Sequence, residues 1–319
     1  MADLFYNDAG RLRSVWRLAV FVFLACVAYA AIIIVARFVP AFFVSRETYR
    51  WLLDESGWGW VIQSWVIFIP AALVGWVCAY ALEDLPWRSL GWALHRGWVR
   101  DSLLGALVGG AAVVVAALLG MATGGTGISA AGFGAGVVWT LVVSAFIFLL
   151  GAAAEEMLFR GYALQTLMRS WPLWVALLPV SVFFALVHLA NPNVAPGFTF
   201  VNTVLAGVWL GVAYWRTRSL WFPLGLHFGW NWVQGAVLGS PVSGIKEITP
   251  HPLLSFNAGG PAWVGGGAYG IEGGAACTLV LVLMTLFIWR TGLLTASPEM
   301  RQYTDGENPN PQTPHVTPT

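Results

Sequence analysis

Eight long apolar stretches dominate the sequence, and each is close to the length that an α-helix needs to cross a lipid bilayer. A crossing of the roughly 30 Å hydrocarbon layer takes about 20 residues of helix. The stretches run over approximately 16–35, 60–81, 103–121, 137–158, 172–189, 198–215, 220–239 and 275–289. The pattern predicts an all-α, polytopic membrane protein with about eight transmembrane helices.

Composition agrees with a membrane protein and excludes several other classes. Charged residues make up 10% of the chain, against roughly a quarter in soluble domains, and the mean hydropathy is +0.72. A net charge of +1 gives no field that would attract nucleic acid. The three cysteines lie inside apolar stretches without the spacing of a metal site or a disulfide framework. We therefore expect the lipid bilayer, and no nucleic acid, as a partner.

The distribution of Lys and Arg between the connecting segments predicts the orientation. With eight crossings both termini lie on one side, and cytoplasmic loops carry the excess of these residues. Twelve arginines fall on the side of the termini and four Lys or Arg on the other. Both termini are therefore expected in the cytoplasm. We assign 1–295 to one membrane domain and expect the Pro-, Asn- and Thr-rich segment 296–319 to be a disordered C-terminal tail.

Few ionisable side chains fall inside the predicted helices. Each costs about 2.5 to 3.5 kcal/mol on insertion scales, so each requires a partner or a function. The embedded set consists of Glu155, Glu156, Arg160, His188 and His227. Four neutral amides accompany them, namely Gln63, Asn202, Asn231 and Gln234.

The adjacent glutamates predict two different roles. Residues four apart share a helix face whereas consecutive residues diverge, so Glu156 can reach Arg160 and Glu155 points elsewhere. Glu156 and Arg160 are interpreted as an internal ion pair. Glu155 is left as a carboxylate in a poorly solvated position, which suits a general base.

Counting residues along the predicted helices places further polar groups at a similar depth in the membrane. If the chain turns at 169–172, Glu155 and His188 lie about 21 Å and about 24 Å from that turn at a rise of 1.5 Å per residue. His227 and Asn231 share one helix face, and Gln234 extends it. Measured from a turn at 217–219, His227 lies only about 13 Å deep, so its agreement with the other two is looser.

Structural roles compete with the functional interpretation. A single buried histidine, or Asn231 alone, could simply hydrogen-bond neighbouring helices, and the Glu156–Arg160 pair could be purely structural. The glycine-rich segment 240–274 could be a lid or an irregular connection, and we favour the connection. An embedded carboxylate without a partner is harder to explain by packing, and its position near two histidines favours a site.

These groups can hydrolyse an amide. A carboxylate beside an imidazole can deprotonate water, and a second imidazole with an amide can donate to a developing oxyanion. Three other intramembrane protease designs are absent from the sequence: an H-E-x-x-H motif, paired aspartates within helices and a G-x-S-x-G turn.

Three motifs together resemble a known family. They are Glu155-Glu156-x-x-x-Arg160, Phe184-x-x-x-His188 and His227-x-x-x-Asn231, each on a separate predicted helix, within 151–239. Their order and spacing resemble the CPBP family, the CAAX-protease and bacteriocin-processing group also called Abi.

The resemblance implies an intramembrane endopeptidase of the type that trims prenylated CAAX proteins after the modified cysteine. Glu155 and His188 would activate water, and His227 with Asn231 would form the oxyanion hole. Glu156, Arg160 and Phe184 would support the site. We expect the glutamate-type mechanism without a cofactor, although the family was formerly classed with metalloendopeptidases and Glu155, His188 and His227 could hold zinc.

One departure favours a bacterial member of the family. The eukaryotic branch has a Phe four residues before its second histidine, and this chain has Pro223 there. We therefore expect a multi-pass protein of the bacterial plasma membrane, acting on a membrane-associated protein or peptide. The alternative is a non-catalytic immunity or scaffold protein that keeps the fold.

Overall fold

The computed structural model describes residues 2–8, 10–38, 43–55, 57–194 and 197–305. Within these residues five helices are long and apolar enough to cross a membrane. They are α2 (Ser14–Phe38), α4 (Trp58–Glu83), α5 (Trp98–Ala122), α6 (Ala135–Glu156) with its continuation to Met168, and α9 (Phe198–Thr217). The prediction of an all-α polytopic membrane protein is confirmed.

Three shorter helices complete the match with the eight predicted stretches. They are α8 (Leu173–His188), α10 (Trp221–Trp232) with the π-helical turn η5 (Val233–Val237), and α12 (Ala275–Arg290). The fourth stretch extends further than predicted, because α6 continues through the π-helix η4 (Met157–Ala163) into α7 (Leu164–Met168).

The remaining elements are short. They comprise α1 (Ala2–Phe5), α3 (Arg46–Arg50), η2 (Trp51–Glu55), η3 (Trp87–Leu90), α11 (Ala262–Gly265), η6 (Gly267–Tyr269), η7 (Ile271–Gly273) and α13 (Pro298–Thr304). Two strands, β1 (Gly127–Ala130) and β2 (Leu254–Asn257), pair antiparallel, with Gly127 opposite Asn257. This ribbon joins the α5–α6 connection to the long segment after α10.

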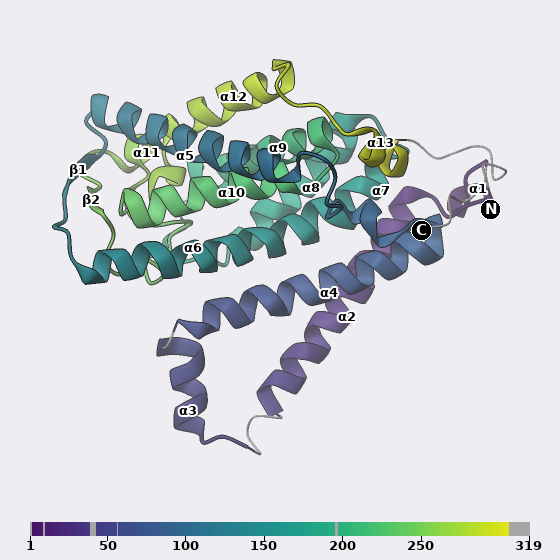
Figure 1. Cartoon of the computed structure of the whole chain (residues 1–319), viewed down its shortest axis with the longest axis horizontal. Helices are drawn as coiled ribbons and strands as arrows, with labels where there is room; N and C mark the ends of the chain where they lie inside the picture. Colours follow the sequence, from purple (N-terminus) through teal and green to yellow (C-terminus); the bar gives the residue numbers. More distant parts are fainter. Residues whose placement is uncertain (1, 9, 39–42, 56, 195–196, 306–319) are drawn as a thin grey trace.

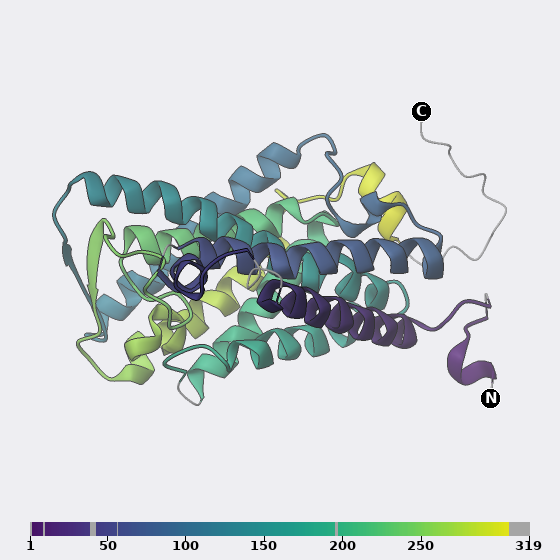
Figure 2. The same ribbon diagram turned by 90° about the horizontal axis from the view of Figure 1, so that it is seen from below.

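The helices form a bundle and an arm. Helices α5, α6, α8, α9, α10 and α12 pack as the bundle, while α2 and α4, joined through α3, lie on one side and diverge from it (Figures 1 and 2). Helix α4 packs against α6 and η4, which attaches the arm to the bundle. Most of α2 is exposed, as expected for a helix that faces lipid.

Glycines allow α5 and α10 to approach each other closely. A Cβ atom at Gly109 would lie 2.0 Å from the carbonyl oxygen of Leu226, and one at Gly229 would lie 2.1 Å from that of Ala106. Small residues spaced four apart permit such backbone contact between membrane helices. The contact fixes α10, the helix that carries His227 and Asn231.

A buried cluster of charged residues joins the arm to the bundle. The sequence-based inventory of embedded ionisable residues did not include it. Arg17 of α2 donates to Glu83 Oε1 at 2.7 Å, and Thr166 donates to the same oxygen at 3.1 Å. Arg169 Nε lies 3.9 Å from this oxygen. Arg17 and Glu83 belong to α2 and α4, so the inventory of embedded charges is larger than predicted.

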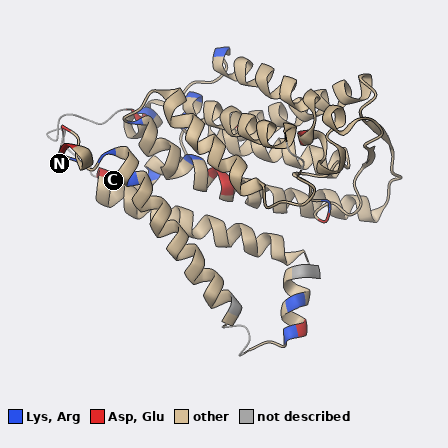
Figure 3. Cartoon of the chain, turned by 180° about the vertical axis from the view of Figure 1, so that it is seen from behind, with Lys and Arg blue, Asp and Glu red and all other residues tan. Residues whose placement is uncertain are grey.

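The two ends of the described chain lie at the same end of the molecule. Helices α1 and α13 are found there together (Figure 1), and many of the Lys and Arg residues gather nearby (Figure 3). This agrees with the predicted arrangement of the termini on one side.

The C-terminal segment is more ordered than predicted as far as Asp305. Residues Pro298–Thr304 form α13, and Ser297 caps it by accepting from the backbone N–H of Met300. Arg169 and Arg218 donate to the carbonyl groups of Tyr303 and Thr304. Segment 306–319 lies outside the described residues, so its predicted disorder stays a prediction.

Candidate functional site

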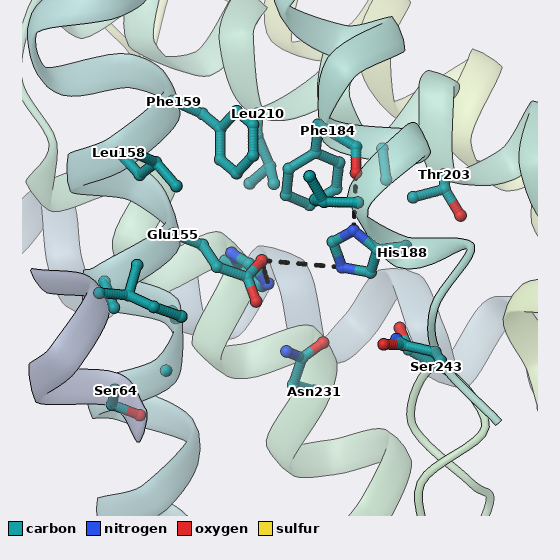
Figure 4. A pocket seen from close by; sticks show the side chains of 18 of the residues that line it. Ser64, Glu155, Leu158, Phe159, Phe184, His188, Thr203, Leu210, Asn231 and Ser243 are labelled. Atoms are coloured by element: carbon teal, nitrogen blue, oxygen red, sulfur yellow. Dashed lines mark hydrogen bonds and ion pairs between the residues drawn. The ribbon is translucent and has the colours of Figure 1, made fainter. Parts of the chain in front are cut away.

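Glu155 and His188 face each other across a cavity between α6 and α8. Oε2 of Glu155 lies 3.9 Å from Nε2 of His188, and the two side chains point toward one another (Figure 4). The Glu155 side chain is 31% exposed and that of His188 15%. Oε2 of Glu155 is itself buried and has no hydrogen-bond partner among the described residues, so its capacity to accept hydrogen bonds is unfilled.

The backbone of α8 fixes the orientation of His188. Nδ1 lies 2.7 Å from the carbonyl oxygen of Phe184, one turn earlier. A carbonyl oxygen only accepts, so Nδ1 donates and the neutral ring carries its lone pair on Nε2. The Phe184 ring packs on the imidazole with a centroid separation of 4.4 Å. His188 thus presents a proton acceptor to Glu155 and the cavity.

His227 of α10 lies between the two adjacent glutamates. Its Nε2 is 3.7 Å from Oε2 of Glu155, and its Nδ1 is 2.9 Å from Oε1 of Glu156. The Glu156 carboxylate accepts from Nδ1, so Nε2 can donate only when the ring is doubly protonated. Two carboxylates beside one imidazole stabilise that protonated form.

Glu156 and Arg160 form the predicted pair and share it with His227. Arg160 Nη1 donates to Oε1 of Glu156 at 3.1 Å, and Nη2 donates to the carbonyl of Gly207 at 3.2 Å. The guanidinium also lies over the Phe184 ring, 4.7 Å from its centroid. Glu156 therefore positions a histidine of the candidate site as well as neutralising an arginine.

Of the four embedded amide side chains, three line the cavity and one forms a hydrogen bond to the backbone outside it. Asn231 lies one helical turn after His227 and lines the same cavity (Figure 4), which Gln63 also lines. Gln234 instead donates to the carbonyl of Pro241 at 2.6 Å. Asn202 lines the cavity and donates to the carbonyl groups of Glu272 and Gly274 at 2.7 and 2.9 Å.

The cavity has a volume of about 730 Å³ and lies between the arm and the bundle. Small-molecule and cofactor sites typically measure about 300–1,000 Å³. Its lining includes Phe21 and Cys26 from α2 and Trp60 and Pro70 from α4, opposite the polar groups of α6, α8 and α10. The surface is mostly apolar, so a membrane-embedded chain would lose little on entering it.

Glu272 is a further cavity residue that the sequence did not single out. It lies in η7, at the end of the glycine-rich segment, and its carboxylate accepts from Trp230 Nε1 at 3.2 Å. The backbone N–H and the hydroxyl of Ser243 donate to its other oxygen at 2.5 and 3.1 Å. Segment 240–274 thus contributes to the cavity and is more than a connection. A lone Glu in a loop gave no periodic signal that could have revealed it.

The donor set does not fit a metal ion. Among the described residues, no group of three or more His, Cys, Asp or Glu side chains has the geometry to hold one. Glu155, His188 and His227 supply suitable atom types, with Oε2 of Glu155 3.9 Å and 3.7 Å from the Nε2 atoms of the two histidines.

The fold and the site together define a polytopic membrane protein with a carboxylate and two imidazoles around an intramembrane cavity. Residues 137–233 match a family model described as Rce1-like, type II CAAX prenyl endopeptidase Rce1-like. No curated protein and no solved structure matches the chain.

The matched segment contains all seven residues that the three motifs single out. Segment 137–233 is therefore similar to the Rce1-like family. The resemblance to the CPBP family that the motifs indicated is confirmed.

Proposed function

We propose that this protein is an intramembrane endopeptidase of the glutamate type, which hydrolyses a peptide bond of a membrane-associated protein or peptide. One observation carries the proposal. A single carboxylate oxygen, Oε2 of Glu155, lies within 4 Å of the Nε2 atoms of both His188 and His227, on the wall of a cavity large enough for a peptide segment.

Glu155 and His188 activate the water. A water oxygen about 2.8 Å from both Oε2 and Nε2 can donate one hydrogen to each acceptor, which leaves a lone pair for attack. The water oxygen bonds to the carbonyl carbon of the substrate, and its proton passes to the Glu155–His188 pair. When the tetrahedral intermediate collapses, the C–N bond breaks and the pair returns the proton to the leaving amine.

His227 and Asn231 stabilise the oxyanion of that intermediate. The side-chain amide of Asn231 supplies an N–H donor from the same face of α10. His227 supplies a second donor through Nε2 in its protonated form, since Nδ1 is already directed at Glu156. Glu156 and Arg160 hold His227 in place, and Phe184 positions His188 through its carbonyl group and its ring.

The distribution of Lys and Arg and the departure at Pro223 support a bacterial plasma membrane protein with both termini in the cytoplasm. The mostly apolar cavity wall between α2, α4 and the bundle supports a substrate that is itself embedded in the membrane.

A comparison of protein termini in membranes tests the proposal. Membranes that contain the wild type are compared with membranes that contain Glu155→Gln, which keeps the size of the side chain and removes its charge. Glu47→Gln is the matched control, because Glu47 is exposed on α3. We expect at least one new terminus with the wild type and the control that is lost with Glu155→Gln.

An identical set of termini in all three membranes would contradict the proposal. If Glu155→Ala and His188→Ala also complement the cellular phenotype, the protein acts by binding, as an immunity or scaffold protein.

Metal analysis of the purified protein tests the cofactor-free mechanism separately. A stoichiometric zinc ion that is lost in His188→Ala would contradict it.

A further inference from the structure

The charged groups that line the cavity are carboxylates and imidazoles. Among its described lining residues the ionisable groups of these two kinds are Glu155, His188, His227 and Glu272, and the lining includes no Lys or Arg. Arg160, one turn from Glu156, is 1% exposed and is already engaged with Glu156 and Gly207. A negatively charged group of a substrate would therefore find no Lys or Arg in the cavity, and the imidazolium of His227 is already flanked by Glu155 and Glu156.

Hydrogen bonding indicates that Glu272 is a carboxylate. Three donors converge on its two oxygens: Trp230 Nε1, the backbone N–H of Ser243 and the Ser243 hydroxyl. An ionised carboxyl group only accepts and has about four lone-pair positions, whereas a protonated one must also donate. The arrangement thus suits the charged form and leaves one lone pair of Oε1 for a further donor.

The backbone around Glu272 is rigidly held. Asn202 binds the carbonyl groups of Glu272 and Gly274, and Thr278 donates to Oδ1 of Asn202 at 2.6 Å. Gly270 has a φ of +97° and lies so close to the 240–245 turn that a Cβ atom would be 2.1 Å from the carbonyl oxygen of Pro241. A fixed charge on a rigid wall can discriminate between substrates, because it cannot move away from an unfavourable group.

We propose that Glu272 selects the substrate, so that the cavity accepts an internal chain segment with a Lys or Arg side chain near the scissile bond and rejects a free C-terminal carboxylate. The proposal rests on the proposed function. In a C-terminal tripeptide product the free carboxylate stays within about 10 Å of the scissile bond, at about 3.3 Å per residue. It would therefore lie in or beside a cavity that already presents Glu155 and Glu272.

A positively charged substrate side chain would be attracted by the same carboxylates that repel a C-terminal carboxylate. A Lys or Arg side chain can donate to Oε1 of Glu272 in a poorly solvated space, where charge-assisted hydrogen bonds are strong. We therefore expect cleavage of bonds near a basic residue rather than release of a C-terminal tripeptide.

A peptide library tests this specificity. Synthetic single-span peptides with a randomised eight-residue stretch are reconstituted with the full-length protein in phosphatidylethanolamine–phosphatidylglycerol vesicles, and the products are identified by mass spectrometry. Each peptide is made in two forms. In the first form, the free C-terminal carboxylate directly follows the randomised stretch. In the second form, ten neutral residues separate the randomised stretch from the C-terminus. Glu155→Gln gives the background.

For the wild type we expect Lys or Arg at one fixed position from the cleaved bond to be preferred over Gln by about tenfold to a hundredfold. Bonds three residues from a free terminus should be cleaved about tenfold more slowly than the same bonds in the extended peptides. Glu272→Gln should lose both preferences while it still cleaves neutral sequences, and Glu272→Asp should retain them.

Glu247→Gln is the matched control, because it makes the same change in the same segment at an exposed carboxylate that is not among the lining residues of the cavity. Loss of the preferences in Glu247→Gln as well as in Glu272→Gln would show a structural role and overturn the proposal. So would a wild type that cleaves C-terminal tripeptides as fast as internal bonds, a comparison that holds even if Glu272→Gln fails to fold. Glu155-dependent cleavage without these preferences leaves the proposed function intact, whereas no cleavage of any peptide overturns both.

Discussion

Nδ1 of His227 lies 2.9 Å from Oε1 of Glu156, although the two residues are 71 positions apart in the chain. The bond leaves Nε2 of His227 directed toward Glu155 and makes the proposed oxyanion role dependent on a protonated ring. Glu156 is fully buried, so its charge acts on His227 with little screening by solvent. The second glutamate of the pair therefore supports both Arg160 and the candidate site.

Glu156→Gln should reduce peptide cleavage without abolishing it. The amide oxygen can still accept from His227, but the charge that stabilises the imidazolium is lost. We expect kcat to fall about tenfold to a hundredfold, which corresponds to about 1.4 to 2.8 kcal/mol of transition-state stabilisation. The fall should be smaller than that caused by Glu155→Gln, and equal activities of Glu156→Gln and the wild type would contradict this role.

Larger residues at the contact between α5 and α10 should inactivate the protein through the position of α10. Gly109→Ala places a methyl group 2.0 Å from a backbone oxygen of α10, so the helices must separate and shift His227 and Asn231. A displacement of about 1 Å can cost about a hundredfold in rate. Gly110→Ala is the matched control, because its Cβ would lie 3.0 Å from the Val233 side chain and 3.6 Å from the carbonyl oxygen of Gly229, which is an ordinary van der Waals contact. Cleavage rates and thermal unfolding should be measured for both, and equal rates would contradict the prediction.

The buried cluster at the base of the arm should contribute to stability rather than to chemistry. Glu83→Gln leaves Arg17 and Arg169 without their shared carboxylate, which should lower the free energy of unfolding by about 3 to 5 kcal/mol. Glu299→Gln removes the exposed partner of Arg88 and should change it by less than about 0.5 kcal/mol. Denaturation in detergent gives both values. A Glu83→Gln protein as stable as Glu299→Gln would show that the cluster is not a stabilising joint.

The preference for basic substrates should disappear on acidification. Burial raises the pKa of Glu272, and this effect outweighs the hydrogen bonds from Ser243 and Trp230 and the neighbouring His188, which lower the pKa. A glutamate with a raised pKa takes up its proton, and loses its charge, at a higher pH than an exposed glutamate, which titrates near pH 4.3.

The ratio of cleavage rates for Lys and Gln peptides measures this effect, because changes in the shared catalytic groups cancel. The other titratable groups near Glu272 are His188, Tyr269 and Cys277. As the pH is lowered, the wild-type ratio should fall to about one before pH 4.3 is reached. The ratio for Glu272→Gln should not change with pH. A wild-type ratio that is constant down to pH 4.3 would contradict the prediction.

The long helices and the proximity of Glu155 and His188 could be predicted from the sequence because both follow from local rules. Apolar length sets each membrane helix, and a helical hairpin with one turn brings residues equidistant from the turn to one depth. The depth of His227 was less well predicted. Ser219 and Leu220, in the turn before α10, are fully buried against the segment around Gly91 and His95. Ser170, in the turn before α8, is exposed. Depths counted in residues from these two turns therefore do not start at the same level.

Contacts between distant segments could not be predicted in the same way. Arg17 and Glu83 lie at the margins of apolar stretches, where a charge ordinarily meets solvent, and only the packing of α2 against α4 and α7 buries them. Glu272 reaches the cavity because Asn202 and Ser243 hold a glycine-rich segment that has no helical or strand periodicity. The tail helix α13 is stabilised by arginines of three other segments, which a compositional argument cannot take into account.

Single-turnover cleavage in ¹⁸O-labelled water tests most directly whether Glu155 activates a water molecule for attack on a peptide bond. The wild type and Glu155→Gln are each used in excess over a membrane-embedded peptide that the wild type cleaves. The masses of the products are determined by mass spectrometry. We predict one ¹⁸O atom in the new carboxyl group with the wild type, and a rate at least about a thousandfold lower with Glu155→Gln. Cleavage by Glu155→Gln at the wild-type rate would contradict the central claim.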